Sequence, residues 1–150
     1  MEEAAAVRDA YYAAMPGLHR LSMLVQQKSL GPAGGIRTAG GRFMPIEPAR
    51  LDPKTGEMQT YGYKMLNKLC QGSAADMTKQ AIVDFGMAGT KGKMLLQVYD
   101  ELDISVPKES LGAIASTLNE CMVNAMPLDV LMKVDMEIGP SWGELMPVTI

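Results

Sequence analysis

Residues 94–106 read Met-Leu-Leu-Gln-Val-Tyr-Asp-Glu-Leu-Asp-Ile-Ser-Val, and the prediction of the fold starts from them. Two short apolar runs, 94–98 and 102–106, flank a polar step at 99–101. Apolar runs of this length on either side of a polar break are typical of a β-hairpin. The break lacks the Asn-Gly or Asp-Gly pair that favours a tight turn. It places two adjacent carboxylates at the predicted tip instead.

Length and composition predict one globular domain over residues 1–150. The chain has 150 residues, of which 47% are hydrophobic and 21% charged, which is ordinary for a folded domain. No apolar run approaches the roughly 18 residues that a membrane span needs, so no membrane partner is expected. The first eight residues are acidic and lack the apolar core of a signal peptide. Cys70 and Cys121 are isolated, which suggests buried thiols in a reducing compartment, so a cytoplasmic location is expected.

Charge is unevenly distributed along the chain. The net charge is −3, but residues 20–93 carry 11 Lys/Arg against 5 Asp/Glu, while the remainder carries 3 against 12. A basic middle and an acidic end suit a chain that contacts phosphate in one region and holds cations in another. The alternative is that these are solvated surfaces of unequal charge.

The first part of the chain, residues 1–59, is predicted to hold two helices and a glycine-rich hairpin. Helices are expected over 2–15 and 18–30, with Pro16-Gly17 between them. The segment 31–59 is irregular, and Ala39-Gly40-Gly41 is expected to turn a short hairpin. The segment has no Walker spacing and no strand-to-helix GxGxxG, so a nucleotide cradle is not predicted.

One long helix is predicted over residues 60–88. Its buried face follows the helical period at Leu66, Leu69, Cys70, Ala74, Met77, Ala81 and Phe85. The opposite face carries Lys64, Asn67, Lys68, Gln71 and Lys79. A row of basic and amide side chains suits a duplex, where it would contact phosphate and base edges. An ordinary solvated face is the alternative.

The last part of the chain adds a helix and a strand to the hairpin. Residues 107–125 are predicted as a helix with Pro107 in its first turn. Residues 130–138 alternate between apolar and polar side chains, which predicts a half-buried strand. Strands in an antiparallel sheet (the hairpin plus this C-terminal strand) with helices packed on one face give an α+β fold.

The hairpin tip has the side chains that a magnesium site uses. Mg²⁺ prefers one or two carboxylates together with water and phosphate oxygens, and Asp100 and Glu101 could supply them. A third acid is needed, and Asp103 could assist from the same strand face. Two such ions would clamp the attacking and leaving oxygens of a phosphoryl transfer. A solvated turn is the alternative, and general acid/base use of the pair is a weaker one.

Four segments follow one another along the chain between residues 69 and 142: Leu69-Cys-Gln-Gly-Ser-Ala-Ala-Asp76, Leu95-Leu-Gln-Val-Tyr-Asp-Glu-Leu102, Leu131-Met-Lys-Val-Asp135 and Gly139-Pro-Ser-Trp142. Together these segments resemble the C-terminal end of family A (DNA polymerase I-like) DNA polymerases. In addition, Gly34-Gly-Ile-Arg-Thr-Ala-Gly-Gly-Arg42 looks like the family's Gly-Tyr-Val-x-Thr-x-x-Gly-Arg segment. The resemblance covers about residues 1–143. It implies the C-terminal part of a polymerase palm, with helices that in the family border the fingers.

The resemblance also implies roles for individual residues. Asp100 corresponds to the family's aspartate that ligates the two catalytic Mg²⁺ ions, and Glu101 is the acid beside that site. Tyr99 stands where the family usually has a histidine that contacts the primer terminus. The resemblance further implies contacts with primer-template DNA, from Asn67 and Gln71 on the minor-groove side and from Arg42, Lys64 and Lys68 to backbone phosphate.

By the same resemblance, the chain lacks the first palm aspartate and the residues that grip the incoming dNTP. A partner chain with the rest of the palm, the fingers and the thumb is then required to complete the two-metal site. This points to the C-terminal subunit of a split, phage-type DNA polymerase, or to a shortened form of a longer one. Two alternatives remain open: a non-catalytic palm-like module that binds DNA or a polymerase, and an orphan domain that self-associates through its Met-rich faces.

Overall fold

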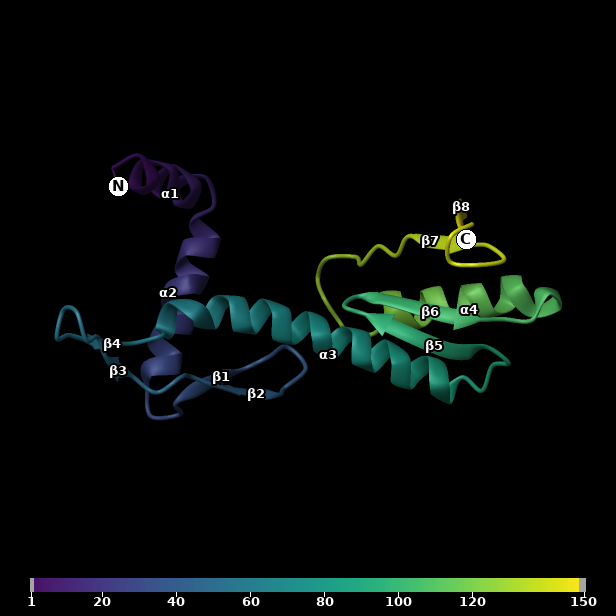
Figure 1. Ribbon diagram of the computed structural model, residues 1–150, viewed down its shortest axis with the longest axis horizontal. Helices are drawn as coiled ribbons and strands as arrows, with labels where there is room; N and C mark the ends of the chain where they lie inside the picture. The colour runs from purple at the N-terminus through teal and green to yellow at the C-terminus, as the bar shows by residue number, and fades with distance from the viewer. Residues whose placement is uncertain (1, 149–150) are drawn as a thin grey trace. The chain divides into compact units, whose positions relative to one another are not determined.

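A computed structural model describes residues 2–148, which fold into two compact units (Figure 1). Unit 1 spans Met1–Ser73 and unit 2 spans Ala74–Ile150, and each is described by itself. The prediction that residues 1–150 form one domain stays a prediction. None of the helices within 2–148 is long and apolar enough to span a membrane.

Unit 1 contains two helices, two small hairpins and the start of a third helix. Its elements are α1 (Glu2–Ala14), α2 (Pro16–Leu30), β1 (Gly35–Arg37), β2 (Phe43–Pro45), β3 (Arg50–Leu51), β4 (Met58–Gln59), a single 3₁₀ turn η1 (Gly62–Lys64) and α3 (Met65–Met87), which continues into unit 2. The predicted helices are confirmed to within a few residues. The proline predicted to interrupt the first two helices is the first residue of α2, where its missing N–H costs no helical hydrogen bond.

The predicted glycine-rich hairpin is confirmed. Strands β1 and β2 pair antiparallel, with Ile36 opposite Met44. The loop between them closes on itself, because Thr38 N–H donates to the Arg42 carbonyl at 2.9 Å and Gly41 N–H donates to the Thr38 carbonyl at 2.9 Å. Gly41 has a φ of 88°, a conformation that favours glycine.

The core of unit 1 forms where α2, β1 and α3 meet. Val25, Ile36 and Met65 are buried there, and Met65 has no exposed surface. Leu66 and Leu69 are packed against this cluster, as predicted. The prediction that Cys70 is buried is wrong, because its side chain is exposed.

The reason lies in which side of α3 the hairpin covers. The fully buried positions in this part of α3 are Met65 and Gly72, a seven-residue step that corresponds to two helical turns. This stripe is offset from the predicted one, so Cys70 and Ala74 both lie on the exposed side. Sequence periodicity located an apolar face on this helix but misjudged its centre.

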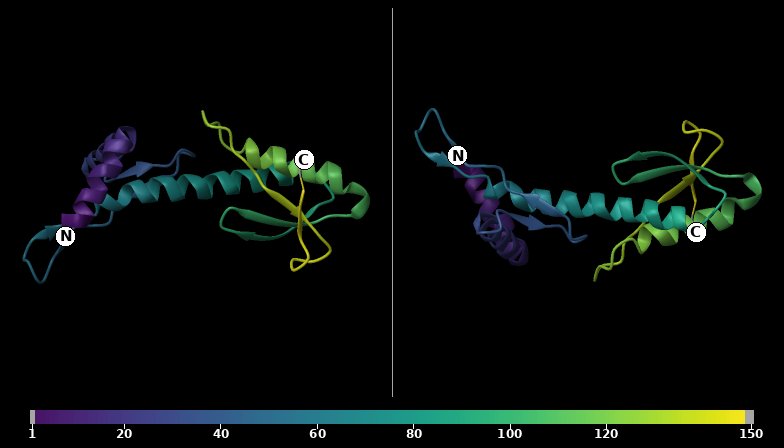
Figure 2. Two further views of the ribbon diagram at one scale, coloured as in Figure 1. Left: turned by 90° about the horizontal axis from the view of Figure 1, so that it is seen from above. Right: turned by 90° about the horizontal axis from the view of Figure 1, so that it is seen from below.

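Unit 2 contains the end of α3, the central hairpin, a helix and a C-terminal hairpin. Its elements are β5 (Lys93–Val98), β6 (Glu101–Ser105), a 3₁₀ turn η2 (Lys108–Ser110), α4 (Leu111–Val123), β7 (Met136–Ile138) and β8 (Met146–Val148). The hairpin predicted from residues 94–106 is confirmed as the antiparallel pair β5–β6. Helix α4 runs alongside this hairpin (Figures 1 and 2).

Side chains from three elements of unit 2 pack closely around Gly92, just before β5. A Cβ atom there would lie 3.0–3.1 Å from side-chain atoms of Phe85, Ile104 and Ile114. These three side chains come from α3, β6 and α4, so they gather the two helices and the hairpin around one point. Phe85 and Ile114 are buried, as are Ala81, Ala115 and Ala125.

The predicted C-terminal strand is shorter than expected and has a different partner. Only Met136–Ile138 forms a strand, and it pairs with β8, so it does not join the hydrogen-bonded pair β5–β6. Residues 130–135 have no ladder partner among residues 2–148, and Leu131 is 90% exposed. Alternation makes a segment able to form a strand, but a neighbouring backbone must accept its hydrogen bonds. The α+β fold class is confirmed, with small antiparallel sheets and four α-helices within residues 2–148.

Candidate functional site

The tip of the β5–β6 hairpin is a two-residue turn, Tyr99-Asp100. Val98 pairs with Glu101, so Glu101 is the first residue of β6 and not part of the turn. Tyr99 has a φ of 52°, where glycine is usual at the first position of such a turn. The side-chain amide of Gln97 donates to the Tyr99 carbonyl at 2.7 Å and holds the turn. Strained backbone of this kind is concentrated at functional sites, which makes the tip a candidate.

The acidic side chains at the tip point into solvent. Asp100 and Glu101 are exposed, and neither carboxylate has a hydrogen-bond or ion-pair partner within residues 2–148. No three Asp, Glu, His or Cys side chains come together in the described part of the chain, so the suggested help from Asp103 does not produce a three-ligand group. The pair fits Mg²⁺, which takes one or two protein carboxylates together with water and phosphate oxygens.

A β-bulge lies in β5 between the core and the tip. Met94 pairs with Ile104 and Leu96 pairs with Asp103, which leaves Leu95 without a residue opposite it. A bulge bends its strand and increases the local twist, and bulges are frequent next to active sites. The extra residue therefore bends β5 between the core and the tip.

In unit 1, the predicted nucleic-acid face of α3 is partly free and partly engaged. Asn67 and Gln71 are exposed and lie one helical turn apart, so their amides project from the same face. They offer donors and acceptors that a duplex groove can use. Lys64 and Lys68, by contrast, contact other parts of unit 1. Lys79, in the part of α3 that belongs to unit 2, is exposed.

Arg42 joins the β1–β2 hairpin to α3. Its Nη2 donates to the Gly72 carbonyl at 3.0 Å, and the Ala39 N–H donates to Ser73 Oγ at 2.9 Å. A Cβ atom at Gly72 would lie 2.8 Å from Thr38 Cγ2, so only glycine permits this approach. The Gly-Ser pair within residues 69–76 is thus explained by docking of the hairpin on the helix. The phosphate contact of Arg42 stays a prediction.

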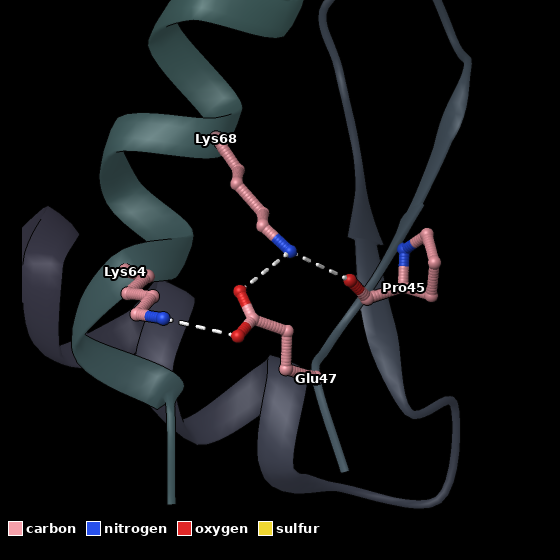
Figure 3. A network of polar contacts seen from close by, with 4 residues as sticks. All are labelled: Pro45, Glu47, Lys64 and Lys68. Atoms are coloured by element: carbon pink, nitrogen blue, oxygen red, sulfur yellow. Dashed lines mark hydrogen bonds and ion pairs between the residues drawn. The ribbon is translucent and has the colours of Figure 1, made fainter.

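Lys64 and Lys68 share one carboxylate, that of Glu47 (Figure 3). Lys64 Nζ lies 3.0 Å from Glu47 Oε2, and Lys68 Nζ lies 3.4 Å from Glu47 Oε1. Hydrogen bonding to Lys64 is the largest cause that lowers the pKa of Glu47, and the same bond raises the pKa of Lys64. Lys68 Nζ also donates to the Pro45 carbonyl at 3.4 Å.

Sequence reasoning missed Glu47. The available signal was its isolation: it is one of only 5 acids between residues 20 and 93, a region that has 11 basic residues. An acid in such surroundings is expected to find a cation. Which lysines it meets depends on how the chain leaves β2, and that is a property of the fold.

Two lone titratable side chains lie outside the tip and the α3 face. His19 is exposed, and its ring stacks on Tyr12 at 4.5 Å between centroids. Cys121 is half-buried, and both it and Cys70 are free thiols. Burial, with Asp84 and Glu120 nearby, raises the pKa of the Cys121 thiol, so it is less reactive than an exposed thiol.

Comparison with known proteins establishes the family. Residues 1–144 match the sequence profile of DNA polymerase family A. The chain belongs to this family. The resemblance seen in the sequence is confirmed, and the tip and the α3 face are parts of a family A polymerase chain.

Individual relatives of the chain are family A DNA polymerases from bacteria and phages. DNA polymerase I of Geobacillus stearothermophilus is 31% identical over 149 residues, covering 94% of this chain and 16% of that protein. The DNA-directed DNA polymerase of Pseudomonas phage M6 is 33% identical over 144 residues, covering 96% of this chain and 20% of that protein. The chain therefore spans about a sixth to a fifth of the length of these curated relatives.

A solved polymerase structure has the same fold as this chain. The POL domain of Pol1 from M. smegmatis, in complex with DNA primer-template and dNTP, superposes with a TM-score of 0.73 at 28% identity. The match covers 88% of this chain and 24% of that one. The α+β arrangement described above is thus that of part of a family A polymerase domain.

Proposed function

We propose that this chain supplies the C-terminal part of the palm to a DNA-directed DNA polymerase. In that role it contributes Asp100 as a ligand of the catalytic Mg²⁺ ions and α3 as a contact surface for primer-template DNA. The single observation that carries the proposal is the strained tip that presents Asp100 to solvent without a partner within residues 2–148.

The tip is suited to hold a metal that other groups also ligate. Asp100 and Glu101 would bind Mg²⁺ through carboxylate oxygens, while phosphate oxygens of the substrate and further protein carboxylates fill the remaining positions. When bound, the ions supply charge stabilisation for nucleotidyl transfer. The chain's own part is to fix Asp100 in place through the Gln97 hydrogen bond and the β5–β6 ladder.

The DNA-facing part of the proposal rests on α3. Asn67 and Gln71 are exposed at a four-residue step, and the amide side chains can accept or donate to base edges in the minor groove. Lys64 ends the 3₁₀ turn η1, Lys68 lies in the first turn of α3, and both would meet backbone phosphate. The M. smegmatis neighbour, solved with primer-template and dNTP, makes DNA and dNTP the ligands to test here.

The proposal includes a need for further polymerase segments. The chain spans about a fifth of its phage relative and a sixth of its Geobacillus relative. In the described residues, the tip provides two carboxylates and no third ligand. The remaining palm, fingers and thumb must then come from elsewhere, either in the same polypeptide or as a separate chain, and without them we expect no primer extension.

Primer extension tests the proposal. The chain is assayed together with the polymerase segments that carry the rest of the palm and the fingers, using primer-template DNA, dNTPs and Mg²⁺. Asp100→Asn keeps the shape of the side chain but removes its charge, and we expect the extension rate to fall by roughly 10²–10³-fold. Asp129→Asn is the matched control, because Asp129 is also an exposed aspartate of unit 2 but lies outside the hairpin.

Two outcomes would contradict the proposal. Extension that is equally fast with Asp100→Asn would remove the metal role from the tip. Duplex binding by the chain that is unchanged by Asp100→Asn, together with no extension under any combination of segments, would favour a non-catalytic module that binds DNA or a polymerase.

A further inference from the structure

We propose that Glu47 is a built-in competitor of DNA phosphate for Lys64 and Lys68, and that it lowers the sequence-independent part of DNA binding. The inference rests on the proposed function, because it assumes that α3 meets a duplex. It assigns a role to a residue that lies outside the polymerase motifs of this chain.

The carboxylate of Glu47 lies between the two ammonium groups, where a DNA phosphate would bind them. Each carboxylate oxygen of Glu47 faces one ammonium group, with Lys64 Nζ at 3.0 Å and Lys68 Nζ at 3.4 Å (Figure 3). Lys64 ends the 3₁₀ turn η1 and Lys68 lies in the first turn of α3, and both side chains reach the same carboxylate. A nucleic-acid phosphate also presents oxygens with shared negative charge, and it would bridge the same two groups in the same way.

Both lysines are held from a second direction as well. Lys64 Nζ lies 4.3 Å from the centre of the Tyr61 ring, within the range of a cation–π contact. Lys68 Nζ donates to the Pro45 carbonyl. These contacts do not depend on Glu47, so the two ammonium groups remain close together when an incoming phosphate replaces the carboxylate.

Replacing the Glu47 carboxylate by a phosphate changes the free energy little, because all three side chains of the cluster are partly exposed to solvent. The side chains of Lys64, Lys68 and Glu47 are 39%, 31% and 42% exposed. Ion pairs at such sites contribute little, because water and salt screen them. Phosphate can therefore displace Glu47 from the two lysines. The binding free energy that results is smaller than it would be if the lysines had no carboxylate partner. Glu47 does not compete for the contacts that Asn67 and Gln71 make with DNA. These two amides therefore supply a larger share of the binding free energy.

Duplex binding by the Glu47→Gln variant tests the inference. The probe is a primer-template duplex, and its dissociation constant is measured over a range of salt concentrations by fluorescence anisotropy. We expect about two- to fivefold tighter binding at low salt and a steeper dependence on salt, because more condensed cations are released. Glu57→Gln is the matched control: Glu57 is an exposed acid of unit 1 that makes no ion pair within residues 2–148.

A double-mutant cycle isolates the lysines. With Lys64 and Lys68 both replaced by Gln, Glu47→Gln should no longer change binding more than Glu57→Gln does. Equal effects of Glu47→Gln and Glu57→Gln in the otherwise native chain would overturn the inference. Weaker binding by Glu47→Gln would also overturn it, and would mean that Glu47 positions the lysines for DNA.

The proposed function can survive the failure of this inference. If Glu47→Gln behaves like its control while primer extension still depends on Asp100, only the competitor role is wrong. If neither the native chain nor its Glu47→Gln variant binds the duplex at low salt, the inference is wrong, and so is the proposed DNA-facing role of α3.

Discussion

The two main hairpins of the chain have similar architecture and opposite surroundings. The loop of β1–β2 is docked on α3 through Arg42 and the Ala39 N–H, and Thr38 is buried beneath it. The tip of β5–β6 has an 88% exposed tyrosine followed by an exposed aspartate. In the sequence, Arg42 and Asp100 were both candidate functional side chains, one for phosphate and the other for metal.

The comparison distinguishes a charged side chain that makes a structural contact from one that is free to bind a ligand. Arg42 has a backbone carbonyl of α3 as partner, so its guanidinium already takes part in docking the hairpin on the helix. Asp100 has no such partner within residues 2–148, so nothing local accounts for a charged side chain there. A charged residue without a structural task, on strained backbone, is the better candidate for chemistry.

Undocking the first hairpin should have the largest effect on stability. Gly72→Ala places a Cβ 2.8 Å from Thr38 Cγ2 and forces the hairpin away from the helix. We expect unit 1 to lose about 1–3 kcal/mol, measured by urea unfolding. Gly86→Ala is the control in the same helix, because nothing lies within 4 Å of its Cβ position; it should stabilise by about 0.5–1 kcal/mol.

A destabilisation of similar size from Gly86→Ala would mean that helix α3 itself, and not the docked hairpin, is sensitive to alanine. In that case the measurement would not show that docking of the β1–β2 hairpin on α3 stabilises unit 1.

The face of α3 beside the docked hairpin provides the next test. Asn67→Ala and Gln71→Ala each remove an exposed amide, and we expect roughly two- to tenfold weaker binding to primer-template DNA, the range for one lost hydrogen bond. Unfolding free energy should stay the same. Gln80→Ala serves as control, because Gln80 lies on the same helix but its amide bonds to Asp84 at 2.8 Å.

Binding that falls equally for Gln80→Ala would show a diffuse electrostatic or helix-wide effect. Binding unchanged in both Asn67→Ala and Gln71→Ala would show that the exposed amides are an ordinary solvated surface.

Removing the backbone strain at the tip of β5–β6 should change stability least. Tyr99→Gly removes the cost of a positive φ, about 1–2 kcal/mol for a residue with a Cβ, and adds glycine's conformational entropy cost of about 0.5–1 kcal/mol. We expect unit 2 to be more stable by about 0.5 kcal/mol, measured by denaturant unfolding. Tyr99→Phe keeps the ring and should leave stability unchanged.

If Tyr99→Gly slows primer extension while it stabilises unit 2, the exposed ring has a functional task and the strain is retained for it. If the variant destabilises unit 2 instead, the ring packs in a way that its 88% exposure does not suggest.

Local patterns predicted the helices and both hairpins. Residues 94–106 carry two strand-like runs around a polar break, and the hairpin forms there because its strands are adjacent in the chain. The same holds for Ala39-Gly40-Gly41, where glycines allow the loop. The candidate tip residues Asp100 and Glu101 were identified by residue type and by the family resemblance, and their exposure agrees with the role proposed for them.

Features that depend on distant partners could not be predicted. The exposure of Cys70 follows from which side of α3 the first hairpin covers, and the helical period does not specify that side. Residues 130–135 lack a partner strand, although their alternation suits one. Glu47 meets two lysines only because the chain leaving β2 passes beside α3.

The bulge at Leu95 has a consequence for insertions and deletions in this hairpin. Strand β5 has 6 residues and β6 has 5, so the first strand is one residue longer than its pairing requires. Loss of Leu95 would keep every cross-strand pair and yet straighten the strand. A shortened hairpin would therefore fold with its ladder intact and aim Asp100 in a new direction, a defect that only a measurement of catalysis would reveal.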